Sequence, residues 1–239
     1  MTEAEWWARD DPTLMLFFLL GREGDERRAF CRGAVGSRKL RLFACACLYR
    51  VWHLLPDGRS RAAVKLADHY AEGGGYKEKI AVARHEADCA VRAADYAARD
   101  AAGEAVAEAA VAAARALDPD GGYAARGSAY YARRAVGLFA GGAAEGREAE
   151  DQCRLLRCVI GSPFRTPAPL TIDWLSWNGR TVQKLARAIY DECRFEEVPV
   201  LADALEDAEC TDAALLNHLR EPGPHTRGCW PVDLALGLG

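Results

Sequence analysis

The chain has 239 residues; half of them are hydrophobic, 28% are charged, and the formal net charge is −4. This balance is typical of a soluble globular protein, and the length suffices for one large domain or two small ones. Proteins that bind duplex nucleic acid usually carry a basic excess, so the negative net charge argues against nucleic acid as the main partner.

The nine cysteines do not form the pattern of a disulfide-stapled secreted domain. Their number is odd, and several, such as Cys45, Cys47 and Cys89, lie in apolar helical patterns where a free thiol is a small buried hydrophobe. The N-terminal residues do not form a secretory signal, and the apolar run at 14–20 is too short to span a bilayer. We therefore expect a cytoplasmic protein without membrane association.

Helix signals follow one another through the N-terminal part of the chain. The apolar periodicity, together with the positions of serine, proline and glycine, predicts helices over about 2–8, 12–20, 38–55 and 60–72. Between them, the segment 22–36 is charged and contains glycine, which is typical of a helical turn and a linker.

The segment 76–117 has a different composition, because 18 of the 37 residues from Ala81 to Leu117 are alanine. Alanine has the highest helix propensity, so the segment predicts either one long helix or a helical hairpin interrupted at Gly103. Small side chains let helices approach closely but bury little apolar area each. We interpret this alanine-rich arm as scaffold.

Helices are again expected over 123–140 and 145–160, and the three prolines within 161–169 indicate a linker. The region 170–239 carries further amphipathic segments and several tryptophans. No stretch has the period-two alternation of a strand, so the predicted fold is an all-α, multi-helix array. We expect region 170–239 to pack on the helices of 1–160, which makes one domain overall.

Two segments resemble a bacterial protein family that has no assigned activity. The first contains R-K-L-R-L-F-A-C-A-C and V-W-H-L-L, and the second contains L-A-D-A-L-E-D-A-E-C-T-D and P-G-P-H-T-R-G-C-W-P-V-D-L. The resemblance covers residues 1–75 and 153–237 and leaves the alanine-rich middle outside. The stretch 21–36 departs from the family pattern, and the family supplies no catalytic residue.

Two cysteines and two histidines lie close together near the C-terminus, and Trp230 follows the last of them. Cys210, His218, His225 and Cys229 have the spacing C-x7-H-x6-H-x3-C. Thiolate and imidazole are zinc ligands, but this spacing lacks the short pairs of standard zinc modules at both ends. The same residues suit a Cys–His catalytic pair, or simple packing with His218 at a helix C-terminus.

No other pattern is a complete catalytic or cofactor motif. His85, Glu86 and Cys89 imitate a zincin helix with one ligand replaced and no third ligand. The leading hypothesis is therefore a non-enzymatic helical module for interaction or scaffolding. We expect it to bind a protein partner and to need no cofactor. The alternative is a small metalloprotein or hydrolase that uses the C-terminal cysteines and histidines with zinc.

Overall fold

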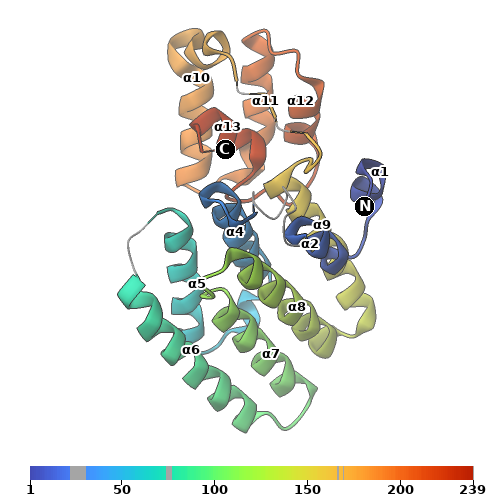
Figure 1. Ribbon diagram of the computed structural model, residues 1–239, viewed down its shortest axis with the longest axis vertical. Coiled ribbons are helices and arrows are strands. Elements are labelled where there is room, and N and C mark those ends of the chain that lie inside the picture. Colours follow the sequence, from blue (N-terminus) through green and yellow to red (C-terminus); the bar gives the residue numbers. More distant parts are fainter. Residues whose placement is uncertain (22–30, 74–76, 166, 169, 239) are drawn as a thin grey trace. The chain divides into compact units, whose positions relative to one another are not determined.

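The computed structural model describes residues 1–21, 31–73, 77–165, 167–168 and 170–238 (Figure 1). These residues form α-helices and short 3₁₀ helices, and no β-strand occurs among them. The predicted all-α, multi-helix fold is therefore confirmed. Most of the predicted linker at 22–36, namely residues 22–30, lies outside the described part.

The chain divides into two compact units, Met1–Leu156 and Arg157–Gly239. The boundary falls inside a helix, a few residues before the proline-rich segment 161–169 that the sequence suggested as a linker. That segment therefore belongs to the C-terminal unit. The packing of residues 170–239 on the N-terminal helices stays a prediction.

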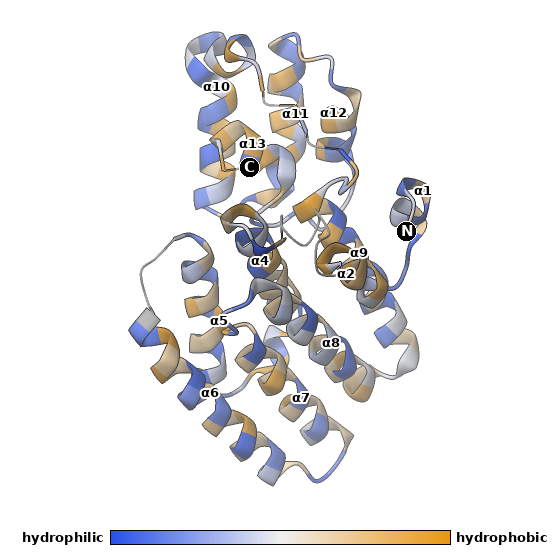
Figure 2. Cartoon of the chain, in the orientation of Figure 1, coloured by the Kyte–Doolittle hydropathy of each residue, from blue (hydrophilic) through white to orange (hydrophobic). Residues whose placement is uncertain are grey.

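The N-terminal unit is built around one deeply buried helix, α4, whose residues 39–48 are all buried. The helix α4 contacts α5 and α8, and α7 contacts both α6 and α8. The helix α2 is hydrophobic along nearly its whole length (Figure 2). The elements of this unit are α1 (Glu3–Ala8), α2 (Pro12–Leu20), α4 (Ala34–Arg50), η1 (Trp52–Leu54), α5 (Gly58–Ala71), α6 (Lys77–Ala97), α7 (Ala101–Arg115), α8 (Gly121–Ala140) and most of α9 (Gly142–Ile160).

The alanine-rich segment forms the hairpin of α6 and α7, and its break lies before Gly103. The side chain of Asp100 accepts a hydrogen bond from the Gly103 N–H and caps α7, so Gly103 lies in the first turn of that helix. A side chain at Gly103 has no room, because its Cβ would lie 2.9 Å from the Ala98 Cα. The glycine thus permits the tight turn and does not end the helix.

The C-terminal unit contains the end of α9, α10 (Ile172–Asp191), η2 (Phe195–Glu197), α11 (Val198–Asp207), α12 (Ala213–Arg220) and α13 (Trp230–Leu236). Its apolar core is formed by side chains from each of these α-helices, including Val182, Leu201, Leu205 and Leu219. The helix α10 is interrupted at residues 177–180, where the backbone leaves helical dihedral angles. None of the described helices is both long and apolar enough to cross a bilayer.

Candidate metal centre

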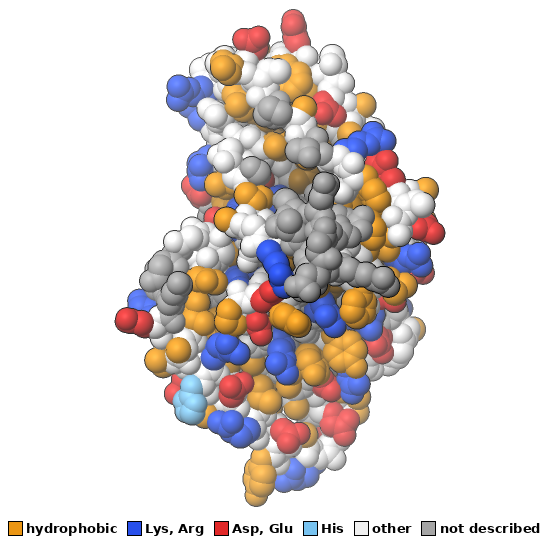
Figure 3. All heavy atoms as spheres, in the orientation of Figure 1, with side chains coloured by type: hydrophobic (Ala, Val, Ile, Leu, Met, Phe, Trp, Pro, Cys, Tyr) orange, Lys and Arg blue, Asp and Glu red, His pale blue; other side chains and the backbone are white. Residues whose placement is uncertain are grey.

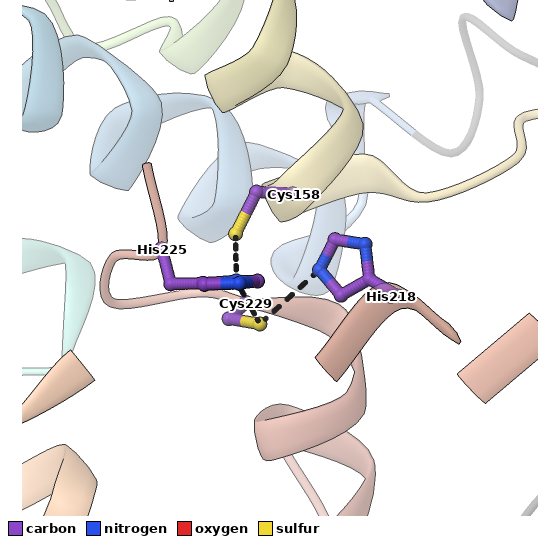
Figure 4. A group of neighbouring side chains, drawn as sticks. All are labelled: Cys158, His218, His225 and Cys229. Carbon is purple, nitrogen blue, oxygen red and sulfur yellow. Dashed lines mark hydrogen bonds between the residues drawn. The ribbon is translucent and has the colours of Figure 1, made fainter. Parts of the chain in front are cut away.

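Four side chains from separate elements of the C-terminal unit converge on one point (Figure 4). Cys158 lies in the last turn of α9, His218 in α12, His225 in the loop that follows, and Cys229 at the N-cap of α13. Their ligand-type atoms, two sulfurs and two ring nitrogens, all lie within 4.8 Å of one another. Among the described residues, this is the one group of at least three such side chains close enough to share an ion.

Local sequence signals position the three C-terminal members. The carboxylate of Asp212 accepts hydrogen bonds from the N–H groups of Ala214 and Leu215, which starts α12 so that His218 falls in its last turn. Gly228 has a φ of +85°, a left-handed conformation that glycine adopts without strain. It turns the chain into Cys229, the N-cap of α13, and Pro231 lies in the first turn of that helix.

Three of the six interatomic distances agree with the edges of a tetrahedron around a zinc ion, and all four donor atoms lie within 4.8 Å of one another. Cys229 Sγ lies 3.5 Å from His218 Nε2 and 3.8 Å from His225 Nδ1, and Cys158 Sγ lies 3.7 Å from His225 Nδ1. Zinc–sulfur and zinc–nitrogen bonds of ordinary length place tetrahedral sulfur and nitrogen ligands about 3.6 Å apart. The three measured edges fall around that value.

The ring of His225 is oriented by a second contact. Its Nε2 lies 3.1 Å from the backbone carbonyl oxygen of Glu221. A carbonyl oxygen only accepts, so Nε2 carries a hydrogen, and Nδ1 is the ring nitrogen that faces the two sulfurs. A ligand histidine that donates its other N–H to a carbonyl is the usual outer-shell arrangement of protein metal sites.

Aromatic packing covers the site on the side of His218, and His225 is partly buried. The rings of His218 and His225 meet edge to face at a centroid distance of 5.1 Å, and the Trp230 ring lies 5.5 Å from that of His218. Gly161, with a φ of +71°, lies under the indole, where a Cβ would come within 3.2 Å of ring atoms. Cys158 is 2% exposed and Cys229 is fully buried, so the two sulfurs are shielded from solvent.

The electrostatics of the group favour one thiolate. Burial opposes ionisation of Cys158, but hydrogen bonds with Cys229, His218 and His225 outweigh it and hold the pKa of this thiol well below its usual value. Burial likewise works against a charged His225, yet the contact with Cys158 raises its pKa. Burial, and then the neighbouring Cys158, raise the pKa of Cys229. A preformed thiolate is the form of cysteine that binds metals.

The structure brings together His218, His225 and Cys229 of the four residues singled out in the sequence, but not Cys210. Cys210 is buried ahead of α12, and burial raises the pKa of its thiol. Cys158, which no local spacing indicated, occupies the fourth corner. Its distance of 60 residues from His218 explains why a short motif could not include it.

The other candidate residues of the sequence do not form a comparable site. Cys89 Sγ lies 3.8 Å from His85 Nε2 and accepts a hydrogen bond from Arg92, and no third ligand joins them among the described residues. Cys45 and Cys47 are buried in α4, as expected for packing residues.

Comparison with known proteins adds no assignment. No protein-family model matches the chain, and neither a curated protein nor a solved structure matches it.

Proposed function

We propose that the C-terminal unit is a non-enzymatic helical interaction module whose fold is held by a structural Zn²⁺. The ligands would be the Sγ atoms of Cys158 and Cys229, Nε2 of His218 and Nδ1 of His225. The observation that carries the proposal is the convergence of these four atoms within 4.8 Å, with edges of 3.5–3.8 Å where sulfur contacts nitrogen.

The donor set favours zinc over other common ions. Two thiolates and two imidazoles form one of the standard ligand sets of structural zinc, which is four-coordinate and tetrahedral. Magnesium and calcium require oxygen ligands, and no carboxylate belongs to the group. Rieske [2Fe–2S] centres use the same donor set, but they place the two cysteines and the two histidines on different irons. Here sulfur lies 3.5–3.8 Å from nitrogen in three pairs, which suits ligands of a single ion.

The closure of the site supports a structural role and argues against the hydrolase alternative. A hydrolytic zinc keeps three protein ligands and one open position for water, whereas here four protein ligands fill the tetrahedron. Both sulfurs are nearly or completely buried, which also deprives a Cys158 nucleophile of access to substrate. We therefore assign the unit to binding and scaffolding.

The first test is the metal content of the full chain, purified without a histidine tag. Elemental analysis is expected to find about one zinc ion per chain, because the four ligands form a single site. Cys158→Ser and Cys229→Ser should lose this zinc. Cys210→Ala is the matched control, a buried cysteine of the same unit outside the ligand group, and it should retain zinc.

Cobalt replacement keeps the test informative if the serine variants fail to fold. Co²⁺ in the unmodified chain should give thiolate-to-metal charge transfer and the intense visible bands of a tetrahedral site. Azide should leave these bands unchanged, since a closed site has no position for it, whereas a catalytic site would bind azide. The zinc assignment fails if the chain holds neither metal, or if Cys210→Ala loses zinc as completely as Cys158→Ser.

A further inference from the structure

A groove in the N-terminal unit, remote in sequence from the cysteine and histidine group, has the features of a ligand site. It has a volume of about 280 Å³ and runs along the exposed side of α8, bordered by α2 and by the end of α7. Tyr123 and Tyr130 line it with 63% and 41% of their surface exposed. Figure 3 shows basic, acidic and hydrophobic side chains interspersed over this part of the molecule.

Two arginines of the groove have no carboxylate partner among the described residues. The guanidinium of Arg126 lies 4.5 Å from the centre of the Phe17 ring, and that of Arg115 lies 6.0 Å from the centre of the Tyr131 ring. Stacking uses the face of a guanidinium and leaves the N–H groups on its edge free for an oxyanion. By contrast, Arg134, which lies on α8 like Arg126, forms an ion pair with Glu108 at 3.1 Å.

A glycine fixes the position of Arg115. The side chain of Arg115 crosses α8 at Gly127, where a Cβ would lie 2.8 Å from both Cβ and Cγ of the arginine. Any larger residue at 127 would therefore displace Arg115 from the groove. The one acidic residue of the lining, Asp118, accepts a hydrogen bond from the Asp120 N–H.

A buried acceptor lies at the inner side of the groove. Gln152 is fully buried, and its Nε2 donates to the Ala129 carbonyl and to Glu148, each at 3.1 Å. Because both partners are acceptors, the orientation of the amide is determined. Its Oε1 is then left without a donor among the described residues. Buried carbonyl oxygens are seldom left unpaired, so the Gln152 Oε1 atom is suited to accept a hydrogen bond from an N–H or O–H group of a bound molecule.

We propose that the groove binds a small aromatic oxyanion, which is a planar ring with an N–H or O–H donor and a phosphate or carboxylate group. The oxyanion binds the N–H edges of the Arg115 and Arg126 guanidinium groups. The ring lies against Tyr123 and Tyr130, and its donor reaches Oε1 of Gln152. Burial of one planar ring suits the modest volume of the groove.

Calorimetric titration of the full, zinc-loaded chain tests this with two ligands that distinguish the oxyanion. These are adenosine 5′-monophosphate, which carries phosphate, and indole-3-acetate, which carries carboxylate. At least one should bind with a submillimolar dissociation constant, and adenosine and inorganic phosphate should each bind about tenfold or more weakly, since each lacks half of the contacts. If indole-3-acetate binds, its N-methyl analogue should bind more weakly, because it cannot donate to Gln152.

Arg126→Ala and Gly127→Ala should weaken binding by about tenfold or more, the first by removing a charge–oxyanion contact and the second by moving Arg115. Arg147→Ala removes the same charge from an exposed position on α9 outside the groove and should leave binding unchanged. The proposal is overturned if neither ligand binds, or if Arg147→Ala weakens binding as much as Arg126→Ala.

Discussion

Removing zinc should lower the stability of the C-terminal unit without abolishing its fold. The unit has its own apolar core, in which Leu201, Leu205 and Leu219 are fully buried, so it does not depend on metal as the smallest zinc modules do. Zinc bound only by the folded state at a free concentration 1,000 times its dissociation constant stabilises that state by about 4 kcal/mol.

For a domain of this size, about 4 kcal/mol corresponds to a melting temperature lower by about 15–30 °C in the metal-free chain. Circular dichroism follows the helices of the whole chain. Tryptophan fluorescence includes a signal from the site, because one of the six tryptophans, Trp230, packs on His218. Cys229→Ser should melt like the chelated protein, whereas Cys210→Ala in excess zinc should melt much closer to the unmodified protein. The reasoning is refuted if chelation removes bound zinc yet leaves the transition in place, or if both variants melt alike.

Three further changes have defined outcomes in urea unfolding. Gly161→Ala should lower the free energy of unfolding by about 1–2 kcal/mol, because alanine at a φ of +71° is strained and its Cβ contacts the Trp230 ring. Gly146→Ala should raise the free energy of unfolding by about 0.5–1 kcal/mol, because Gly146 lies within α9 and a Cβ there meets no other atom. A lower free energy of unfolding would contradict the helix assignment. Arg50→Met should lower the free energy of unfolding by about 1–3 kcal/mol, because it leaves Glu148 buried without its cation. The loss should be smaller than for a fully buried ion pair, because the Arg50 side chain is 32% exposed. Burial raises the pKa of Glu148. The loss of stability in Arg50→Met should therefore shrink as the pH falls through that pKa, because the protonated carboxyl no longer needs a cation. A loss that does not depend on pH would contradict the explanation by an unpaired Glu148 carboxylate.

The fold class was predictable because helix signals are local. Apolar periodicity and capping residues act over a few neighbours, and they identified most helices correctly. The turn of the alanine-rich hairpin was misplaced, because two interpretations of Gly103 compete. Glycine weakens a helix interior, but it is also required where two backbones approach closely. Only the contact with Ala98 and the cap by Asp100 decide between them.

The candidate site was predictable only in the part that is local. His225 and Cys229 are four residues apart, and His218 is close before them, so three members of the group appear together in the sequence. Cys210 is a cysteine at a similar distance from His218 along the chain, but it does not belong to the group of side chains that converge. Cys158 is brought in by tertiary packing alone. Nothing in the residues around Cys158 distinguishes it from the other buried cysteines of the chain.

The order of the ligands along the chain explains what a bound ion would contribute. Cys158 precedes α10 and α11, and the other three ligands follow α11, so zinc would join the beginning of the C-terminal unit to its end. Closing a loop of this length in a flexible chain is entropically costly. Here α10 and α11 pack in a common apolar core that already brings the ends together. The folding of the core therefore pre-organises the site, and nearly all of the metal–ligand free energy is left to stabilise the unit.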